Sequence, residues 1–304
     1  MQAAGSANKG FFYAFGAYAI WGLVLPIYMK LLSHVSPLEI VAHRVIWAIP
    51  FAVLVLWWQE LLGGVWRYFT QWRTLALAAL TASLISFNWG TYVYAIASGQ
   101  ALDAALGYYI NPLVNVLLGA VILGERPNRL QATAIALAGI AVVILTIKAG
   151  GLPWISLVLA FSFGTYGLLR KMVPVGSTEG FFLEVALLAV PSVLLLAFLP
   201  GDNHVMTGGY VAGMLIFAGP LTAIPLMLFA AGARLLHYST IGILQYMVPT
   251  LLFLTAVFVF GEPFSNWQLV AFCLIWSAVV LYTVALFRNG RARRRAAALT
   301  PQTA

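Results

Sequence analysis

The sequence predicts an all-α integral membrane protein, with ten transmembrane helices arranged as two inverted five-helix repeats around a central cavity. Three observations support this prediction. The 304 residues are 62% hydrophobic and only 8% charged, which does not suit a protein with a water-exposed surface. Apolar runs of about 20 residues, the length that crosses a hydrocarbon core, recur along the whole chain. The second half of the chain also repeats the pattern of the first.

The predicted spans follow one another with short connections. They fall near residues 10–31, 37–58, 74–97, 101–123, 130–147, 152–173, 179–199, 210–233, 239–260 and 267–287. Such short connections require neighbouring helices to be antiparallel and leave no room for a water-soluble domain. The first run is too long for a typical signal peptide and no clear small-residue cleavage site follows it, so we interpret it as an uncleaved span. The longer connection at 59–73 suits a helix lying at the membrane interface.

Positive charge is distributed unevenly between the two sides of the membrane. With ten spans, both termini share one side with the loops after spans 2, 4, 6 and 8. That side holds thirteen of the sixteen Lys and Arg residues, whereas Lys30, Arg44 and Lys148 fall on the other. The positive-inside rule therefore predicts a multi-pass protein of the bacterial inner (plasma) membrane with both termini cytoplasmic. Topology also explains the basic C-terminal tail, so no nucleic-acid partner is expected.

A shift of 137 residues aligns the second half of the chain with the first. It places Tyr109 on Tyr246, Pro112 on Pro249, Gly124 on Gly261, Glu125 on Glu262 and Gln131 on Gln268. For the first two spans the shift is 141 residues, so that His43 meets Glu184 and Pro50 meets Pro191. We therefore predict a cytoplasmic tail at 1–8, a first repeat at 9–147, a second repeat at 151–287 and a basic cytoplasmic tail at 288–304.

Five spans per repeat is an odd number, so the second repeat enters the membrane from the opposite side. Inverted repeats recur in secondary transporters, where two near-equivalent halves exchange conformations and give alternating access to a midplane site. The alternative is a duplicated membrane scaffold without transport. Because the two halves are inverted, Glu125 and Glu262 lie on opposite surfaces and cannot form one acidic site. Each follows a glycine that ends a helix, and we expect it near the N-terminus of the next helix or near an arginine such as Arg126.

Several stretches resemble a known family. They are "GAYAIWGLVLPIYMKLLSHVSPLEIVAHRVIW" near the N-terminus and "YYINPLVNVLLGAVILGERPNRLQ" at the end of span 4, together with the "P…GE" pattern that closes spans 4 and 9. The chain is similar to EamA-type members of the drug/metabolite transporter superfamily, in particular the RarD-like group. The resemblance implies that helices 1–4 and 6–9 surround a cavity while helices 5 and 10 pack outside. It also implies export of small metabolites, since similar YddG-type proteins export amino acids and RarD-like proteins are associated by name with chloramphenicol.

Polar and aromatic side chains at membrane depth are the candidate substrate contacts, because such groups face a cavity or a partner. The candidates are Trp21, Asn88, Trp89, Tyr92, Tyr108, Asn111, Tyr166, Gln245 and Tyr246. Aromatic walls with a few amides suit a zwitterion with a variable side chain. The alternative for any one of these residues is a hydrogen bond that only packs helices together.

Four ionisable residues are candidates for a gate or for coupling: Glu39, His43, Arg44 and Glu184. The first three lie one to two turns inside span 2, where a structural ion pair with snorkelling is the simpler interpretation. The functional alternatives are an outer gate or a contact to a substrate carboxylate. Because histidine titrates near physiological pH, His43 and its repeat equivalent Glu184 are also candidates for proton coupling.

Known motifs for catalysis, phosphate binding and metal binding are absent from the sequence, so we predict a protein that is not an enzyme and that uses no cofactor or metal. The predicted function is export of amino acids, both aromatic residues and other small zwitterions, or of related metabolites by alternating access. The alternative is a multidrug, chloramphenicol-type or other metabolite exporter of the same superfamily. The expected partners are a small-molecule substrate and the lipid bilayer. Small residues on spans 5 and 10 also allow a homodimer.

Overall fold

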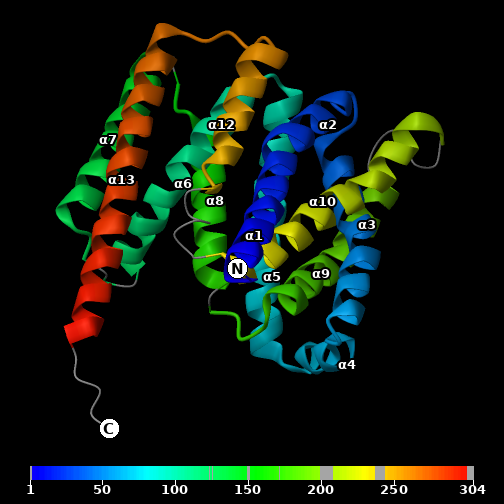
Figure 1. Ribbon diagram of the computed structural model, residues 1–304. Coiled ribbons are helices and arrows are strands. Elements are labelled where there is room, and N and C mark those ends of the chain that lie inside the picture. Colours follow the sequence, from blue (N-terminus) through cyan, green and yellow to red (C-terminus); the bar gives the residue numbers. More distant parts are fainter. Residues whose placement is uncertain are drawn as a thin grey trace.

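In the computed structural model, every regular element of the described chain is a helix (Figure 1). The structure describes residues 2–122, 124, 126–148, 151–170, 172–198, 208–236 and 244–299. Glu125, the repeat equivalent of Glu262, lies outside these ranges, as do Lys171, His204 and His237.

Most helices follow the predicted spans closely. The helices are α1 (Gln2–Ala19), η1 (Ile20–Val24), α2 (Leu25–Leu31), α3 (Pro37–Trp58), α4 (Leu62–Val65), η2 (Trp66–Thr70), α5 (Trp72–Ala97), α6 (Ala101–Ile122), α7 (Arg129–Lys148), α8 (Trp154–Arg170), α9 (Ser177–Phe198), α10 (Gly209–Leu235), α12 (Met247–Leu254), η3 (Thr255–Val259) and α13 (Asn266–Leu299). Exceptions include α12, which begins at Met247 whereas the predicted start at 239 lies outside the described residues, and α13, which continues past the predicted end at 287 to Leu299. The short elements α4 and η2 occupy the connection expected at the membrane interface. Helix α3 begins at a proline, which is favoured in the first turn because its missing N–H would have no intrahelical partner there.

Seven helical stretches in the described chain are long and apolar enough to cross a membrane. They are Asn8–Leu31, Pro37–Trp58, Ala101–Ile122, Arg129–Lys148, Ser177–Phe198, Gly209–Phe229 and Asn266–Ala285. Two further apolar helices, Trp154–Arg170 and Met247–Val259, are shorter. Helix α5 is 26 residues long and coincides with the third predicted span, but polar residues such as Thr81 and Asn88 lower its hydropathy. The chain is therefore an all-α, multi-pass membrane protein.

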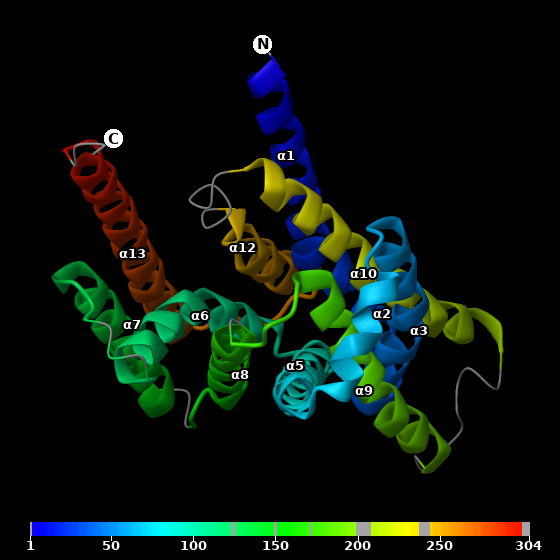
Figure 2. The same ribbon diagram turned by 90° about the horizontal axis from the view of Figure 1, so that it is seen from below.

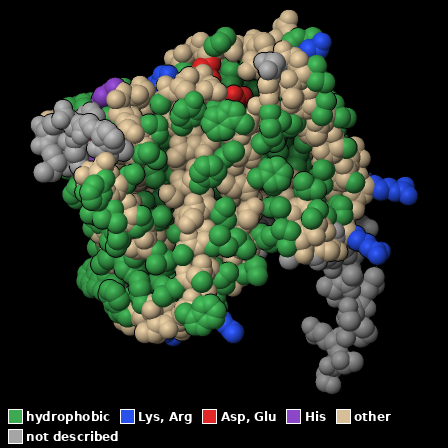
Figure 3. Space-filling view, turned by 180° about the vertical axis from the view of Figure 1, so that it is seen from behind, with side chains coloured by type: hydrophobic (Ala, Val, Ile, Leu, Met, Phe, Trp, Pro, Cys, Tyr) green, Lys and Arg blue, Asp and Glu red, His purple; other side chains and the backbone are tan. Residues whose placement is uncertain are grey.

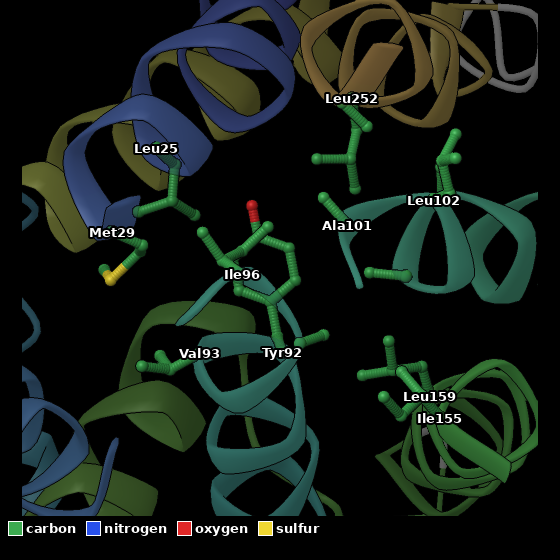
Figure 4. Packing of buried hydrophobic residues seen from close by; sticks show 14 of the residues in the cluster. Leu25, Met29, Tyr92, Val93, Ile96, Ala101, Leu102, Ile155, Leu159 and Leu252 are labelled. Atoms are coloured by element: carbon green, nitrogen blue, oxygen red, sulfur yellow. The ribbon is translucent and has the colours of Figure 1, made fainter. Parts of the chain in front are cut away.

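Most of the extensive helix contacts join elements that are distant in sequence. Helix α13 lies along α7, α6 along α8, and α1 along α10, while α3 contacts both α9 and α10. The α7–α13 pair lies at one edge of the molecule and α3, α9 and α10 lie at the other, as Figure 2 shows from below. Helices α5, α8 and α12 lie between these two groups. The main buried apolar cluster joins these central helices (Figure 4).

The outer surface is largely apolar, as a lipid-facing surface requires. Hydrophobic side chains cover much of the face in Figure 3, whereas charged side chains gather toward its ends and margins. Large apolar residues are exposed on nearly every helix, among them Phe87, Val121 and Phe258. In water such a surface would promote association, whereas in a bilayer it faces lipid tails.

Glu262 caps a helix, but a different helix from the one that the sequence suggested. Its carboxylate accepts hydrogen bonds from the backbone N–H groups of Ala101 (2.7 Å) and Leu102 (2.9 Å), at the N-terminus of α6. The expected partner was the next helix along the chain, α13. The preceding Gly261 has φ +65°, so the chain can reverse after η3 and direct Glu262 toward α6. The carboxylate thus meets the positive end of a helix that begins 161 residues earlier.

Candidate functional site

Arg44 is a buried cation inside the membrane-spanning part of α3. It is seven residues beyond the start of the helix, about 10 Å along its axis at the usual rise. Only 4% of the side chain is exposed. A charge at this depth is costly unless other groups compensate it. Its surroundings therefore indicate what it is for.

Within the described part of the chain, the groups that interact with the Arg44 guanidinium are neutral. The charged carbon lies 4.8 Å from the centre of the Trp89 ring, a cation–π distance. Tyr28, Tyr92 and Tyr108 lie within electrostatic range of it. The rings of Tyr92 and Tyr108 are 6.0 Å apart. We call this group, Arg44 with Trp89, Tyr28, Tyr92 and Tyr108, the arginine cluster. It brings together four of the residues predicted from sequence: Arg44, Trp89, Tyr92 and Tyr108.

Helix α10 holds one side of the guanidinium in place. Arg44 Nε donates a hydrogen bond to Thr222 Oγ1 at 3.2 Å, and the Thr222 hydroxyl donates to the Ala218 carbonyl. This contact depends on Gly219, because a Cβ there would lie 2.1 Å from the carbonyl oxygen of Trp47 on α3. The missing side chain allows the two helix backbones to touch one turn from Thr222. Tyr28 adds a second tie to α10, since its hydroxyl donates to the Met214 carbonyl.

A second buried polar group surrounds Glu184 on α9. One carboxylate oxygen accepts a hydrogen bond from Thr81 Oγ1 on α5 (2.8 Å), and the other accepts one from the Tyr166 hydroxyl on α8 (3.1 Å). Arg170 Nε lies 3.4 Å from the carboxylate. We call these four residues the glutamate network. Unlike Arg44, Glu184 has both an opposite charge and hydrogen-bond donors, so its negative charge is compensated within the protein.

Arg170 reaches Glu184 across a glycine. Its guanidinium also donates to the carbonyls of Gly176 (3.1 Å) and Ser177 (3.2 Å), where α9 begins. A Cβ at Gly180 would lie 1.7 Å from Arg170 Nη2, so only glycine leaves room for the side chain there. Arg170 therefore ties the end of α8 to the beginning of α9.

A row of aromatic rings connects the arginine cluster with the glutamate network. From Tyr108, the row continues to Phe163 at 6.4 Å and from Phe163 to Tyr166 at 5.9 Å. The hydroxyl of Tyr166 then contacts Glu184. These spacings are typical of packed aromatic pairs. The sequence predicted thirteen site residues. Seven of them lie on or next to one continuous line from Arg44 to Glu184, and Asn88 is counted among the seven because it is adjacent to Trp89.

The predicted amides make hydrogen bonds between helices. Asn88 donates to the Leu159 carbonyl (3.1 Å) and to Ser162 Oγ (2.9 Å), both on α8. Asn111 donates to the Ala160 carbonyl (3.1 Å) and accepts from Asn115 (3.2 Å). Asn88 therefore joins α5 to α8, and Asn111 joins α6 to α8.

Three other predicted residues lie apart from the row. Trp21, in the π-helix η1, packs against Tyr18 and Phe229, each with ring centres 5.9 Å away. Gln245 is exposed in the turn before α12. Tyr246 is half-buried next to the main apolar cluster.

Glu39 and His43 form a pair on α3, as their spacing of four residues predicts. Glu39 Oε1 and His43 Nε2 are 3.9 Å apart and both side chains are buried. Within the described ranges, no group of three His, Cys, Asp or Glu side chains could hold a metal ion.

A cavity of about 220 Å³ lies elsewhere, next to the connection between α6 and α7. Its lining residues are Asn115, Val116, Arg126, Pro127, Gln131 and Tyr282. None of them is a predicted site residue, although Asn115 contacts Asn111. We place the candidate site at the arginine cluster. The charge of Glu184 is already compensated and the cavity beside α7 needs no ligand, whereas the buried Arg44 cation lies among neutral groups and lacks a counter-charge among the described residues.

Four contributors to these groups were missed in the sequence: Tyr28, Thr81, Arg170 and Thr222. Arg170 lies four residues after Tyr166 and so on the same helix face, which was a usable signal. Thr81 and Thr222 are isolated hydroxyls in apolar helices and carried no pattern. Their partners lie 103 and 178 residues away.

Comparisons with known proteins show which family the chain belongs to. Residues 8–147 match the EamA-like transporter family. An uncharacterised transporter of Pseudomonas aeruginosa is 42% identical over 95% of this chain and 98% of its own length. Protein RarD of Streptomyces exfoliatus is 39% identical over 99% of this chain and 97% of its own. The chloramphenicol-sensitive protein RarD of Pseudomonas aeruginosa is 34% identical over 87% and 90%, respectively.

One solved crystal structure shares the fold. It has a TM-score of 0.60 and covers 91% of this chain and 96% of its own, at 18% sequence identity. Likeness at that identity concerns the fold alone, whereas the relatives above match in sequence along nearly their whole length. The chain therefore belongs to the drug/metabolite transporter superfamily, as an EamA-type, RarD-like membrane transporter.

Proposed function

We propose that this transporter exports amino acids, or small metabolites with the same combination of an apolar body and a charged group. The observation that supports this most is the arginine cluster together with the aromatic row: rings that can hold an apolar body lie beside a buried cation that can hold an anion. Such a lining suits a small amphipathic solute. A multiply charged solute such as a nucleotide sugar would need more cations than Arg44.

Alternating access is the mechanism that we propose, with ten spans in two inverted repeats (9–147 and 151–287), both termini in the cytoplasm and the protein in the bacterial inner membrane. Two local structures recur at the predicted shift of 137 residues. Asn128 and Gln131 form a reciprocal capping box at the start of α7, and Ser265 and Gln268 form the same box at the start of α13. Gly124 and Gly261 both have positive φ, +67° and +65°. Equivalent local geometry supports an internal duplication.

Since Arg44 is almost fully enclosed, a solute can reach it only when helices separate. The two polar groups involve different helix pairs: the arginine cluster joins α3 to α10, and the glutamate network joins α8 to α9. We propose that these contacts open in turn, with Glu39, His43 and Arg44 near the periplasmic gate and Glu184 near the cytoplasmic one.

The second candidate is export of chloramphenicol-type or other drugs. The aromatic row favours it, because stacked rings also hold an uncharged aromatic solute. One of the relatives is named a chloramphenicol-sensitive protein.

Transport by purified protein in liposomes tests the proposal. Loaded vesicles should release labelled amino acids from a broad panel faster than protein-free vesicles do. Tyr92→Ala should lower the rate about tenfold, the effect of losing one hydrogen bond to a charged group. Phe87→Ala, at an exposed position of the same helix, is the matched control and should leave the rate unchanged. If no amino acid moved while chloramphenicol did, the drug-export candidate would replace the first, and if neither moved, a scaffold function would.

A further inference from the structure

We propose that Arg44 is the binding site for the carboxylate of the transported solute, and that the carboxylate, not the amine, is the group recognised. This inference rests on the proposed transport function and narrows its substrate class to organic monocarboxylates with an apolar body. The step beyond the transport proposal is that the amine is dispensable.

No ion pair of the described residues involves Arg44, so its buried guanidinium has no counter-charge there. Among the described residues, the polar neighbours of the Arg44 guanidinium are Thr222, the Trp89 ring and three neutral tyrosines. The carboxylate of Glu184 is held by Arg170. A buried charge without an opposite partner costs several kcal/mol. A solute carboxylate would supply the missing charge and remove that cost.

Two buried hydrogen-bond donors of the arginine cluster are left unused by the described residues. Within the described chain, Arg44 Nη1 and the Tyr92 hydroxyl are buried and have no hydrogen-bond partner. Figure 4 shows the Tyr92 ring projecting from α5, with Leu25 on one side of it and Leu252 on the other. A carboxylate has two oxygens and accepts from both kinds of donor, and its bonds to a guanidinium are among the strongest that proteins make. One carboxylate could therefore satisfy both groups.

Aromatic rings lie around the Arg44 guanidinium and beside Tyr92. Trp89 lies against the guanidinium, and Tyr92 and Tyr108 pack against each other, so aromatic rings border the anion site. They can hold the apolar body of the solute. An ammonium group would need an acid or several carbonyls, and the hydrogen bonds and ring contacts of the arginine cluster among the described residues go to no acid. A solute without an amine should therefore bind as well as the amino acid.

Three probes that share one phenyl ring test this on the wild-type protein in detergent, by titration calorimetry. They are phenylalanine, 3-phenylpropionate, which lacks the amine, and phenethylamine, which lacks the carboxylate. Phenylalanine and 3-phenylpropionate should bind with affinities within about threefold of each other, and phenethylamine at least about tenfold more weakly, as expected for loss of a charge-assisted hydrogen bond. Equal or tighter binding of phenethylamine would overturn the proposal, and so would a failure of both carboxylates to bind.

Variants then assign the effect to Arg44. Arg44→Gln should weaken binding of 3-phenylpropionate at least about tenfold, whereas Arg44→Lys should retain part of the affinity because it keeps the charge. The matched control is Arg73→Gln, since Arg73 also lies over a tryptophan ring, Trp72 at 5.6 Å, but is exposed. Tyr92→Phe, which removes only the hydroxyl, tests the same site if Arg44→Gln does not fold. Unchanged affinity in Arg44→Gln or, if that variant does not fold, in Tyr92→Phe would contradict the assignment.

Binding and flux separate this inference from the transport proposal. If both carboxylates bind through Arg44 but no solute crosses liposomes, the anion site stands and transport fails. If solutes cross and phenethylamine crosses as fast as phenylalanine, transport stands and the anion site fails.

Discussion

At the scale of single residues, the same side-chain chemistry serves two purposes in this protein. Asn88 and Asn111 are amides at membrane depth, as a solute site would need, yet their hydrogen bonds go to the backbone of α8. Arg44 and Tyr92 instead retain donors without partners among the described residues. The two amides face a neighbouring helix and bond to it. Arg44 Nη1 and the Tyr92 hydroxyl are instead buried in the arginine cluster without a partner among the described residues.

Asn88 should therefore matter for stability. We expect Asn88→Ala to lower the free energy of unfolding in detergent by about 1 kcal/mol, since it removes two hydrogen bonds between α5 and α8. Ser83→Ala on the exposed face of α5 is the control, because Ser83 bonds only within its own helix. Equal stability of the two variants would show that the Asn88 bonds contribute nothing measurable.

Glu262 makes a similar local prediction. Its two oxygens cap the N-terminus of α6, and a neutral amide could replace only one of those acceptors. Glu262→Gln should lower the free energy of unfolding by about 1 kcal/mol through loss of the second bond and of the charge at the helix end. Glu60→Gln, at an exposed position, should have no effect. Chemical unfolding of both variants in the same detergent would measure the difference.

At the scale of helices, hydropathy predicted the elements well and their partners poorly. The predicted span 37–58 coincides with α3, and most other predicted ends lie within two or three residues of the observed ones. Apolar length, together with residues that favour a helix end such as Pro37, predicts most of these bounds. Which helix faces Arg44, or which helix Glu262 caps, depends on contacts between residues more than 150 positions apart. A single sequence contains no local signal for such contacts.

The contact between α3 and α10 depends on one glycine. A Cβ at position 219 would collide with the Trp47 backbone, so Gly219→Ala must push the two helices apart. We expect a loss of about 1–3 kcal/mol in unfolding free energy, typical of overpacking, and weaker binding of 3-phenylpropionate because Thr222 leaves Arg44. Gly213→Ala on the same helix meets nothing within 4 Å and is the matched control. Wild-type behaviour of Gly219→Ala would mean that the close helix contact is not needed.

At the scale of the whole molecule, the proposed inverted repeat makes a prediction that no single helix makes. Pro127 and Pro263 lie in the two exposed turns that follow Gly124 and Gly261. If the halves are inverted, these equivalent turns lie on opposite sides of the membrane. A parallel duplication would place both on the same side.

Single-cysteine labelling distinguishes the two arrangements. Cys273 is the chain's one cysteine, so Cys273→Ser gives a background without thiols. In that background, Pro263→Cys should react with a membrane-impermeant maleimide in intact spheroplasts, because the positive-inside rule places its turn in the periplasm. Pro127→Cys should react only after the membrane is permeabilised. Both prolines are uncharged, so neither substitution alters the distribution of cations that orients the protein. Reaction of both cysteines from the same side would exclude inversion, and with it the proposed exchange of two equivalent halves. Reaction of Pro127→Cys alone would instead preserve the inversion and reverse the orientation, placing Arg44 near the cytoplasmic entrance.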